Sequence, residues 1–348
     1  MIQQIKTSSL GVLKHLGVSN WLAQSAWRRS RLLILCYHGI SLDDEHRWNP
    51  GLYISATHLE ARLELLRKNG CTVLPLGDAV DRLYRNDLPD RAVALTFDDG
   101  YYDFMLRAWP LLQAYQYPAT VYLTTARVEH NLPNVGLFTS YALWLARDRV
   151  LEGDGIPGLA GTYPLATEEQ RAAVVNIVRA WPAKQTGITQ DAIVEAIVRR
   201  LGLDYDGMLR SRILTLMRPD EVTRMSNQGV DFQLHTHWHV TPADVDEFIR
   251  GVRINRERIE TFTGKRATHL CYPSGNYRME YLAALQQYGV ATATTCDPGI
   301  AARASHPLLL PRFIDTTEVS EVVFEGWLTG MAPFLPRRTR KGGYREVN

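Results

Sequence analysis

The segment His235-Thr236-His237-Trp238-His239 carries three imidazoles within five residues. Imidazole is a common ligand of zinc and similar divalent metals. On a continuing strand, the two outer histidines would lie about 13 Å apart, too far to share an ion held at about 2.1 Å from each nitrogen. In a helical turn, residues four apart share one face. The spacing therefore predicts a strand that ends and coils at His235, so that His235 and His239 bind one metal while His237 points away.

Two neighbouring carboxylates, Asp98 and Asp99, follow an apolar run and precede Gly100. Consecutive side chains on a strand point to opposite sides, so one carboxylate can bind a metal while the other faces a substrate. Because Asp-Gly is also common in turns, a solvated turn is the alternative interpretation. Two histidines and one carboxylate leave positions open on an ion that polarises a carbonyl and lowers the pKa of bound water. The spare carboxylate, Asp98, is then the candidate general base.

A further histidine, His38, ends the apolar run 32–38. A lone histidine is more often structural than catalytic. In parallel α/β folds, however, the C-terminal ends of the strands form the reactive rim. His38 falls at such an end, where a general acid for a leaving amine is needed.

The surrounding elements alternate between strands and helices, which favours a parallel α/β architecture. Strands are expected at 32–38, 71–76, 92–97, 118–125, 230–235, 267–273, 290–296 and 306–313. Helices are expected at 57–70, 101–116, 219–228, 242–264, 279–288 and 318–329. Pro110 should kink or divide the second of these helices. From about 127 to 217 the alternation is interrupted by a loop rich in Gly and Pro and by helices near 167–180 and 190–201, which indicates a helical insertion.

Bulk composition is that of an ordinary globular protein, with 45% hydrophobic and 22% charged residues in a chain of 348. The net charge of +2 gives no argument for binding nucleic acid. None of the four cysteines lies in a C-x-x-C pair, so the spacing indicates neither a zinc knuckle nor a redox motif. We expect the cysteines to behave as small buried hydrophobic residues.

Residues 1–30 form a basic, amphipathic segment that could dock on an anionic membrane surface or pack on the domain, and packing is favoured. The main domain is expected over 31–330, followed by a basic tail, 331–348. No secretory signal is evident. We therefore expect a cytoplasmic protein, with peripheral contact at the inner membrane face as an option.

The two motifs, TFDDG at 96–100 and H-T-x-x-H at 235–239, resemble those of the polysaccharide deacetylases of carbohydrate esterase family 4, the NodB-like group. The resemblance runs from about 32 to 328 apart from the insertion. It implies a distorted (β/α)7 barrel. It also implies that Asp99, with both outer histidines, binds a divalent metal, with Zn²⁺ as the first candidate and Co²⁺, Ni²⁺ or Fe²⁺ as alternatives. Asp98 would activate the water that attacks an N-acetyl carbonyl.

The run Tyr37-His38-Gly39-Ile40 resembles a permuted branch of this family that includes poly-N-acetylglucosamine deacetylases. In that branch His38 becomes the candidate general acid. Arg312 resembles a late arginine that orients the base, although a surface arginine at a strand end is the alternative.

The family's third motif is only partly matched by the run 271–277. Pro273 agrees with it, whereas Ser274 replaces an aromatic residue and keeps the backbone N–H that is expected to stabilise an oxyanion. The expected substrate-binding side chains are Tyr101, Trp238, Pro273 and Tyr277.

The resemblance thus predicts a hydrolase that removes N-acetyl groups from a polysaccharide or a lipid-linked amino sugar. O-deacetylation would use the same residues. Two other classes stay open: a hydrolase of C–N bonds in cyclic amides, and a carbohydrate-binding protein without catalysis.

Overall fold

The computed structural model describes residues 10, 18–129, 133–182 and 187–334. The chain forms two compact units, of which the first comprises Met1–Glu129 and Met217–Asn348 and the second His130–Leu216. The insertion was expected at about 127–217. Most of the expected N-terminal segment and the basic tail from 335 onwards lie outside the described residues.

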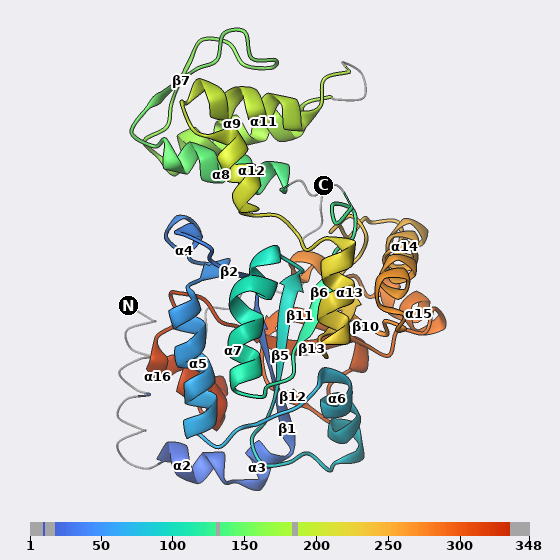
Figure 1. The fold of residues 1–348 in the computed structure, drawn as a ribbon. Helices are drawn as coiled ribbons and strands as arrows, with labels where there is room; N and C mark the ends of the chain where they lie inside the picture. The colour runs from blue at the N-terminus through green and yellow to red at the C-terminus, as the bar shows by residue number, and fades with distance from the viewer. Residues whose placement is uncertain (1–9, 11–17, 130–132, 183–186, 335–348) are drawn as a thin grey trace. The chain divides into compact units, whose positions relative to one another are not determined.

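A closed barrel of seven parallel strands forms the centre of the first unit (Figure 1). Around the barrel the order is β1-β13-β11-β10-β9-β6-β5, and β5 pairs back with β1. This confirms the predicted (β/α)7 barrel. The strands are β1 (Arg31–Tyr37), β5 (Ala92–Asp99), β6 (Thr120–Leu123), β9 (Asp231–Leu234), β10 (His269–Cys271), β11 (Thr292–Pro298) and β13 (Leu310–Ile314).

The strands β1 and β5 are buried along almost their whole length. In a barrel wrapped by helices, alternate side chains face the interior and the helices, so both faces are apolar and the sequence shows a continuous hydrophobic run. The two strands lie side by side with Cys36 opposite Thr96. This register brings the last residues of both strands to one end of the barrel.

Helices lie outside the strands in Figure 1. Those that follow or precede barrel strands are α5 (Ala56–Lys68), α6 (Leu76–Arg85), α7 (Trp109–Ala114), α13 (Pro219–Asn227), α14 (Val245–Thr263), α15 (Glu280–Gln287) and α16 (Glu321–Thr329). Shorter elements of this unit are α2 (Val18–Ala23), α3 (Ala26–Arg29), α4 (Glu45–Trp48), β2 (Gly39–Ile40), β3 (Tyr53–Ile54), β4 (Thr72–Val73) and β12 (Ala301–Ala302).

The sequence analysis did not predict helix α6. Its signal was nevertheless present, because Leu76, Ala79, Val80 and Leu83 recur at helical spacing and are all buried. The strand expected at 71–76 is correspondingly reduced to the two residues of β4.

At two places that contain proline, the predicted element is divided or shortened. The helix expected at 101–116 is divided into a π-helical turn, Phe104–Ala108, and α7, with Pro110 near the start of α7. A proline there has no N–H to donate to the preceding turn, which explains the division. The strand expected at 306–313 begins instead with a 3₁₀ turn, Pro307–Leu309.

The second unit contains four helices and a hairpin in its described residues. Thr167 and Gln170 form the predicted capping box at the start of its second helix. The elements are α8 (Val135–Leu145), β7 (Val150–Glu152), β8 (Thr162–Pro164), α9 (Glu168–Ala180), α11 (Gln190–Arg200) and α12 (Tyr205–Ser211).

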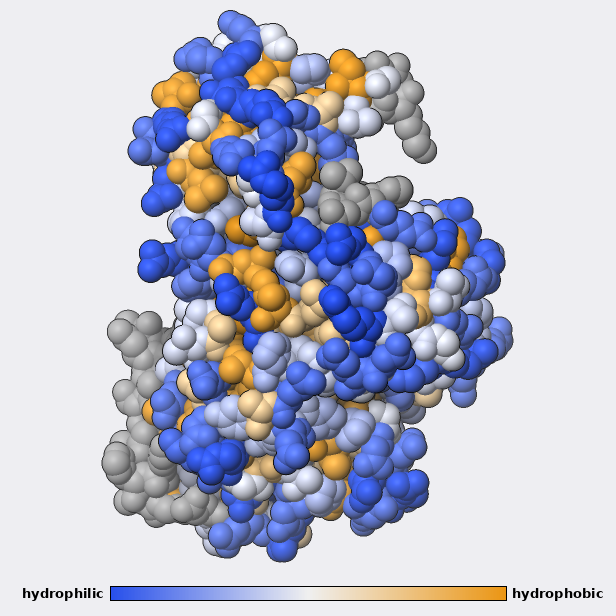
Figure 2. Space-filling model, in the orientation of Figure 1, coloured by the Kyte–Doolittle hydropathy of each residue, from blue (hydrophilic) through white to orange (hydrophobic). Residues whose placement is uncertain are grey.

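The visible surface in Figure 2 is mostly hydrophilic, with hydrophobic side chains in small separate patches. Such patches are ordinary on protein surfaces. Across the described ranges, helices that combine the length and the apolarity needed to traverse a bilayer are absent.

Candidate metal centre and active site

The predicted chemical residues gather at the C-terminal end of the barrel. His38 directly follows β1, Asp98 and Asp99 end β5, and His235 directly follows β9. Arg312 lies within β13. The closed parallel sheet therefore brings together side chains that are up to 274 positions apart in the sequence.

Asp99, His235 and His239 form one group whose possible ligand atoms all lie within 4.8 Å of one another. The Asp99 Oδ1 atom lies 3.3 Å from His235 Nε2 and 3.2 Å from His239 Nε2. Thr236 and His239 adopt left-handed backbone conformations, with φ of 59° and 56°. Such values are uncommon for residues other than glycine, and they show that the chain turns sharply after β9. This turn allows the two imidazoles to approach the same oxygen.

The donor atoms of this group suit a divalent cation. Asp99 Oδ1 is buried and has no well-directed hydrogen bond from any described residue. His235 Nδ1 lies 2.8 Å from the Cys271 carbonyl oxygen. Because a carbonyl only accepts, Nδ1 carries the proton, and the lone pair on Nε2 remains available as a metal ligand. A buried oxygen without a donor, next to two imidazole nitrogens, fits zinc or a similar ion.

Electrostatics keep Asp99 ionised. Burial alone would raise the pKa of this carboxyl group, but the two neighbouring imidazoles outweigh burial and hold the pKa well below its ordinary value. The carboxylate is therefore in the form that binds a cation.

Asn255, on α14, supports this group and was missed by the sequence analysis. Its Oδ1 accepts from the backbone N–H of His235 at 2.9 Å, and its Nδ2 donates to the Leu123 carbonyl oxygen at 2.9 Å and to Thr125 Oγ1 at 3.0 Å. The sequence signal was an amide within the buried stripe of α14. His237 contacts Thr125 Oγ1 through Nδ1 at 2.9 Å and thus points away from the ligand group.

Asp98 faces a different partner. Arg312 donates to both carboxylate oxygens, from Nη1 at 2.7 Å and from Nη2 at 2.8 Å. The Arg312 side chain is 0% exposed, so the alternative of a surface arginine is excluded. Burial alone would raise the pKa of Asp98, but the guanidinium outweighs burial and holds this pKa well below its ordinary value. Asp98 is thus a buried carboxylate that stays ionised.

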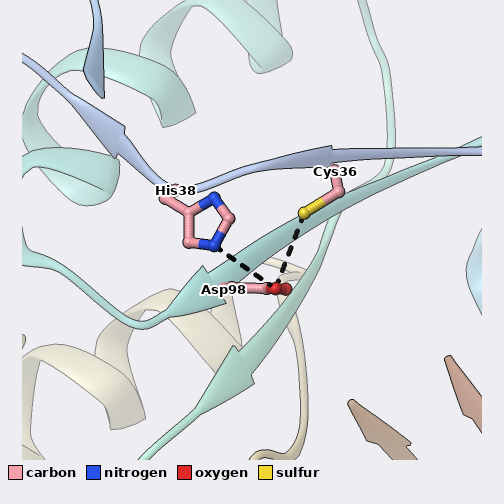
Figure 3. Close-up of side chains that lie close together, drawn as sticks. All are labelled: Cys36, His38 and Asp98. Atoms are coloured by element: carbon pink, nitrogen blue, oxygen red, sulfur yellow. Dashed lines mark hydrogen bonds and ion pairs between the residues drawn. The ribbon is translucent and has the colours of Figure 1, made fainter. Parts of the chain in front are cut away.

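His38 and two thiols also contact Asp98, and Figure 3 shows His38 and the Cys36 thiol beside it. His38 Nε2 lies 3.7 Å from Asp98 Oδ2, and the His38 side chain is 19% exposed. Burial lowers the pKa of His38 despite the nearby carboxylate, which favours the neutral imidazole. The Sγ atoms of Cys36 and Cys271 lie 3.5 Å and 3.4 Å from the same oxygen. Both cysteines are buried, as expected, but they contact the candidate base as well as the hydrophobic core.

The remaining predicted site residues differ in exposure. Trp238 is 41% exposed, with the Arg250 guanidinium 5.0 Å from its ring centroid. Tyr101 is buried against the ring of Tyr53. Ser274 is exposed in a left-handed conformation with φ of 57°, and the contacts of the described residues include none between Ser274 and Asp98 or Asp99. Pro273 is buried, whereas Tyr277 is half-buried against Tyr272.

Comparison with known proteins places this arrangement in a family. The sequence pattern of the polysaccharide deacetylase family matches residues 85–293. Over 100 residues the chain is 32% identical to the poly-β-1,6-N-acetyl-D-glucosamine N-deacetylase of Escherichia coli (strain K12), a match that covers 28% of this chain and 14% of that protein. The chain thus spans only a small part of this relative.

Two solved structures share the fold. The deacetylase PplD of Streptococcus pyogenes, in complex with acetate, superposes with a TM-score of 0.57 at 19% identity and covers 86% of this chain and 98% of its own. IcaB from Ammonifex degensii superposes with a TM-score of 0.55 at 15% identity and covers 87% of this chain and 97% of its own. Because the matched pattern spans more than half of the sequence and the barrel agrees with it, the chain belongs to the polysaccharide deacetylase family.

Proposed function

We propose that this protein is a metal-dependent hydrolase that removes N-acetyl groups from the amino sugars of a glycan. The observation that supports a metal is the buried Asp99 Oδ1 atom, which two imidazole nitrogens approach although no described residue gives it a well-directed hydrogen bond. The observation that supports the N-acetyl substrate is the named activity of the E. coli relative. Zn²⁺ suits two nitrogens and one oxygen at a site with open positions.

An ion held by Asp99, His235 and His239 would polarise the acetyl carbonyl and make water a stronger nucleophile. Asp98 is the proposed general base. Arg312 keeps it ionised, so it can accept a proton from the attacking water.

His38 is the proposed general acid for the departing nitrogen. Its Nε2 atom lies 3.7 Å from Asp98 Oδ2, so a proton collected by Asp98 has a short path to His38. The water proton then balances the proton that the leaving amine receives. The backbone N–H of Ser274 remains the predicted oxyanion donor.

Trp238 is the proposed platform for the sugar ring. It follows the sharp turn after β9, next to the ligand His239, and its indole is partly exposed. Aromatic faces provide large apolar contact area at low conformational cost. A polymeric glycan and a lipid-linked sugar both present such rings. A location at the inner membrane face, through residues 1–30, stays a prediction.

The test is acetate release by the purified protein from N-acetylglucosamine oligomers, before and after a chelator, with re-addition of Zn²⁺, Co²⁺, Ni²⁺ or Fe²⁺. We expect chelation to abolish release and at least one metal to restore it. Release that resists chelation and complete metal depletion would remove the metal from the proposal. Hydrolysis of a cyclic amide without acetate release would favour the other C–N hydrolase, and acetate released only from O-acetylated sugars would favour O-deacetylation.

A further inference from the structure

Cys36, His38 and Asp98 form a second group of possible metal ligands, separate from Asp99 and its two histidines. Cys36 and His38 come from β1 and the residue after it, whereas Asp98 comes from the neighbouring strand β5 (Figure 3). Their ligand atoms all lie within 4.8 Å of one another. The grouping follows from strand geometry, because residues two apart on a strand share a face.

The two separations from Asp98 Oδ2 are close to the edges of a tetrahedral site. Zinc binds sulfur at about 2.3 Å and nitrogen or oxygen at about 2.0–2.2 Å, which places ligand atoms about 3.3–3.6 Å apart. Cys36 Sγ lies 3.5 Å from Asp98 Oδ2, and His38 Nε2 lies 3.7 Å from the same atom. The three ligand atoms are therefore close to the spacing that a small cation requires.

We propose that Cys36, His38 and Asp98 form a second, inhibitory site for a soft divalent cation such as Zn²⁺. The inhibitory part of this inference rests on the proposed function, because the cation would occupy the proposed base and acid. On binding, the Cys36 thiol loses its proton to solvent and the thiolate forms the S–metal bond. His38 contributes its Nε2 lone pair, so neither His38 nor Asp98 can then transfer a proton.

Two features make this site weaker than the Asp99 group. Arg312 donates to the Asp98 oxygen that the cation would share, so a positive charge lies next to the site. Burial raises the pKa of the Cys36 thiol well above its ordinary value, so forming the thiolate is costly. The site should therefore fill only when the cation is in excess. Mg²⁺, which prefers oxygen ligands and keeps its water, should not occupy it.

A third possible group, Asp98 with His235 and Cys271, is a poorer candidate. His235 uses Nδ1 in its contact with the Cys271 carbonyl oxygen and directs Nε2 at Asp99. The Cys271 sulfur lies 3.0 Å from Arg312 Nη2, so it faces the guanidinium directly. Cys36 is therefore the thiol that distinguishes the second site.

The test is a titration of the metal-free, full-length protein with Co²⁺, followed by inhibition with Zn²⁺. Cobalt bound to a thiolate gives a near-ultraviolet charge-transfer absorption, which cobalt bound to oxygen and nitrogen alone does not give. We expect the first equivalent of Co²⁺ to give no such band and the second equivalent to give it. Cys36→Ser should keep the first equivalent and lose the band, and the Zn²⁺ concentration that inhibits should rise about tenfold or more.

Cys71→Ser is the matched control, because Cys71 precedes β4, whose pairing with the first residues of β5 places it at the opposite end of the barrel. This variant should keep the band and the ordinary sensitivity to Zn²⁺. The proposal is overturned if only one equivalent binds, if the band survives in Cys36→Ser, or if Zn²⁺ inhibits both proteins equally. Failure of the proposed function would look different: no metal would support acetate release, whereas the Cys36-dependent band would still report the second site.

Discussion

Asp98 and Asp99 are adjacent in the sequence but lie in opposite kinds of surroundings. The hydrogen-bonding and charge requirements of Asp98 are met within the protein, since Arg312 donates to both of its oxygens. Asp99 keeps a buried oxygen to which no described residue gives a well-directed hydrogen bond. Burying a charge is costly unless it is paired. The contrast teaches that the protein compensates Asp98 by itself, whereas Asp99 keeps an oxygen that the proposed cation would compensate.

Backbone conformation produces this contrast. Thr96 and Asp98 both contact Arg312, as residues two apart on one strand face should. Asp99 has a φ of 71°, which ends the strand and turns its side chain towards the residues after β9. A left-handed conformation costs a non-glycine residue about 1–3 kcal/mol, and such strain clusters at functional sites.

The largest expected effect separates the two carboxylates directly. Asp98→Asn should lower acetate release by roughly 10²–10⁴-fold or more, because the base is lost, and should leave the metal content unchanged. Asp99→Asn should lose both activity and metal. Metal analysis after dialysis, beside an acetate assay, measures both quantities. Thermal unfolding of each variant is the control for folding, and an Asp98→Asn protein that remains active would remove Asp98 from the role of base.

The second-largest effect comes from removing Arg312, the partner of Asp98. Arg312→Met leaves a buried carboxylate without its partner, which should cost about 3–5 kcal/mol of stability. Because Arg312 holds the pKa of Asp98 low, the pair stabilises the protein at pH values above the ordinary pKa of aspartate, and this contribution is lost as the pH falls through the lowered value. The variant should therefore lose most stability at neutral pH and least in acid.

The same variant should also change the pH dependence of catalysis. Without Arg312, burial raises the pKa of Asp98, so the acid limb of the kcat/KM profile should move to higher pH. Arg312→Lys, which keeps the charge, should move it less. An acid limb that stays in place in Arg312→Met would show that Asp98 is not the group that titrates there.

The sequence predicted those parts of this site that depend on local pattern. Strand ends, the spacing of His235 and His239, and the adjacent carboxylates are all local. The alternation of strands and helices predicted a parallel α/β architecture, whereas the closed seven-stranded barrel was predicted from the family resemblance. The thiol contacts of Cys36 and Cys271 were missed because they depend on which strands pair with one another and which face one another inside the barrel. That arrangement is set by register, which no single segment contains.

Helix α6 was missed for a different reason. Its apolar positions are regular, but the helix begins directly after a short strand-like run, and the two patterns overlap at Leu76. Tyr101 shows the converse limit. Its substrate-binding role stays a prediction, because a motif does not contain the exposure that decides whether a side chain reaches a substrate, and Tyr101 is buried.

The smallest expected effect concerns the metal affinity of the group that contains Asp99. Asn255→Ala removes the acceptor for the His235 backbone N–H and leaves the Leu123 carbonyl and Thr125 hydroxyl without this donor. We expect metal affinity to fall about 10–100-fold, as for other groups that orient a metal ligand from behind. Competition with a chromophoric chelator measures this affinity. Arg253→Ala, an exposed position on the same helix, is the control and should leave the metal affinity unchanged.

Arg312→Met should also leave the metal affinity nearly unchanged, because Arg312 compensates Asp98 alone. If instead both Asn255→Ala and Arg312→Met weakened metal binding equally, the two carboxylates would share one electrostatic unit, and the division of roles between them would be wrong.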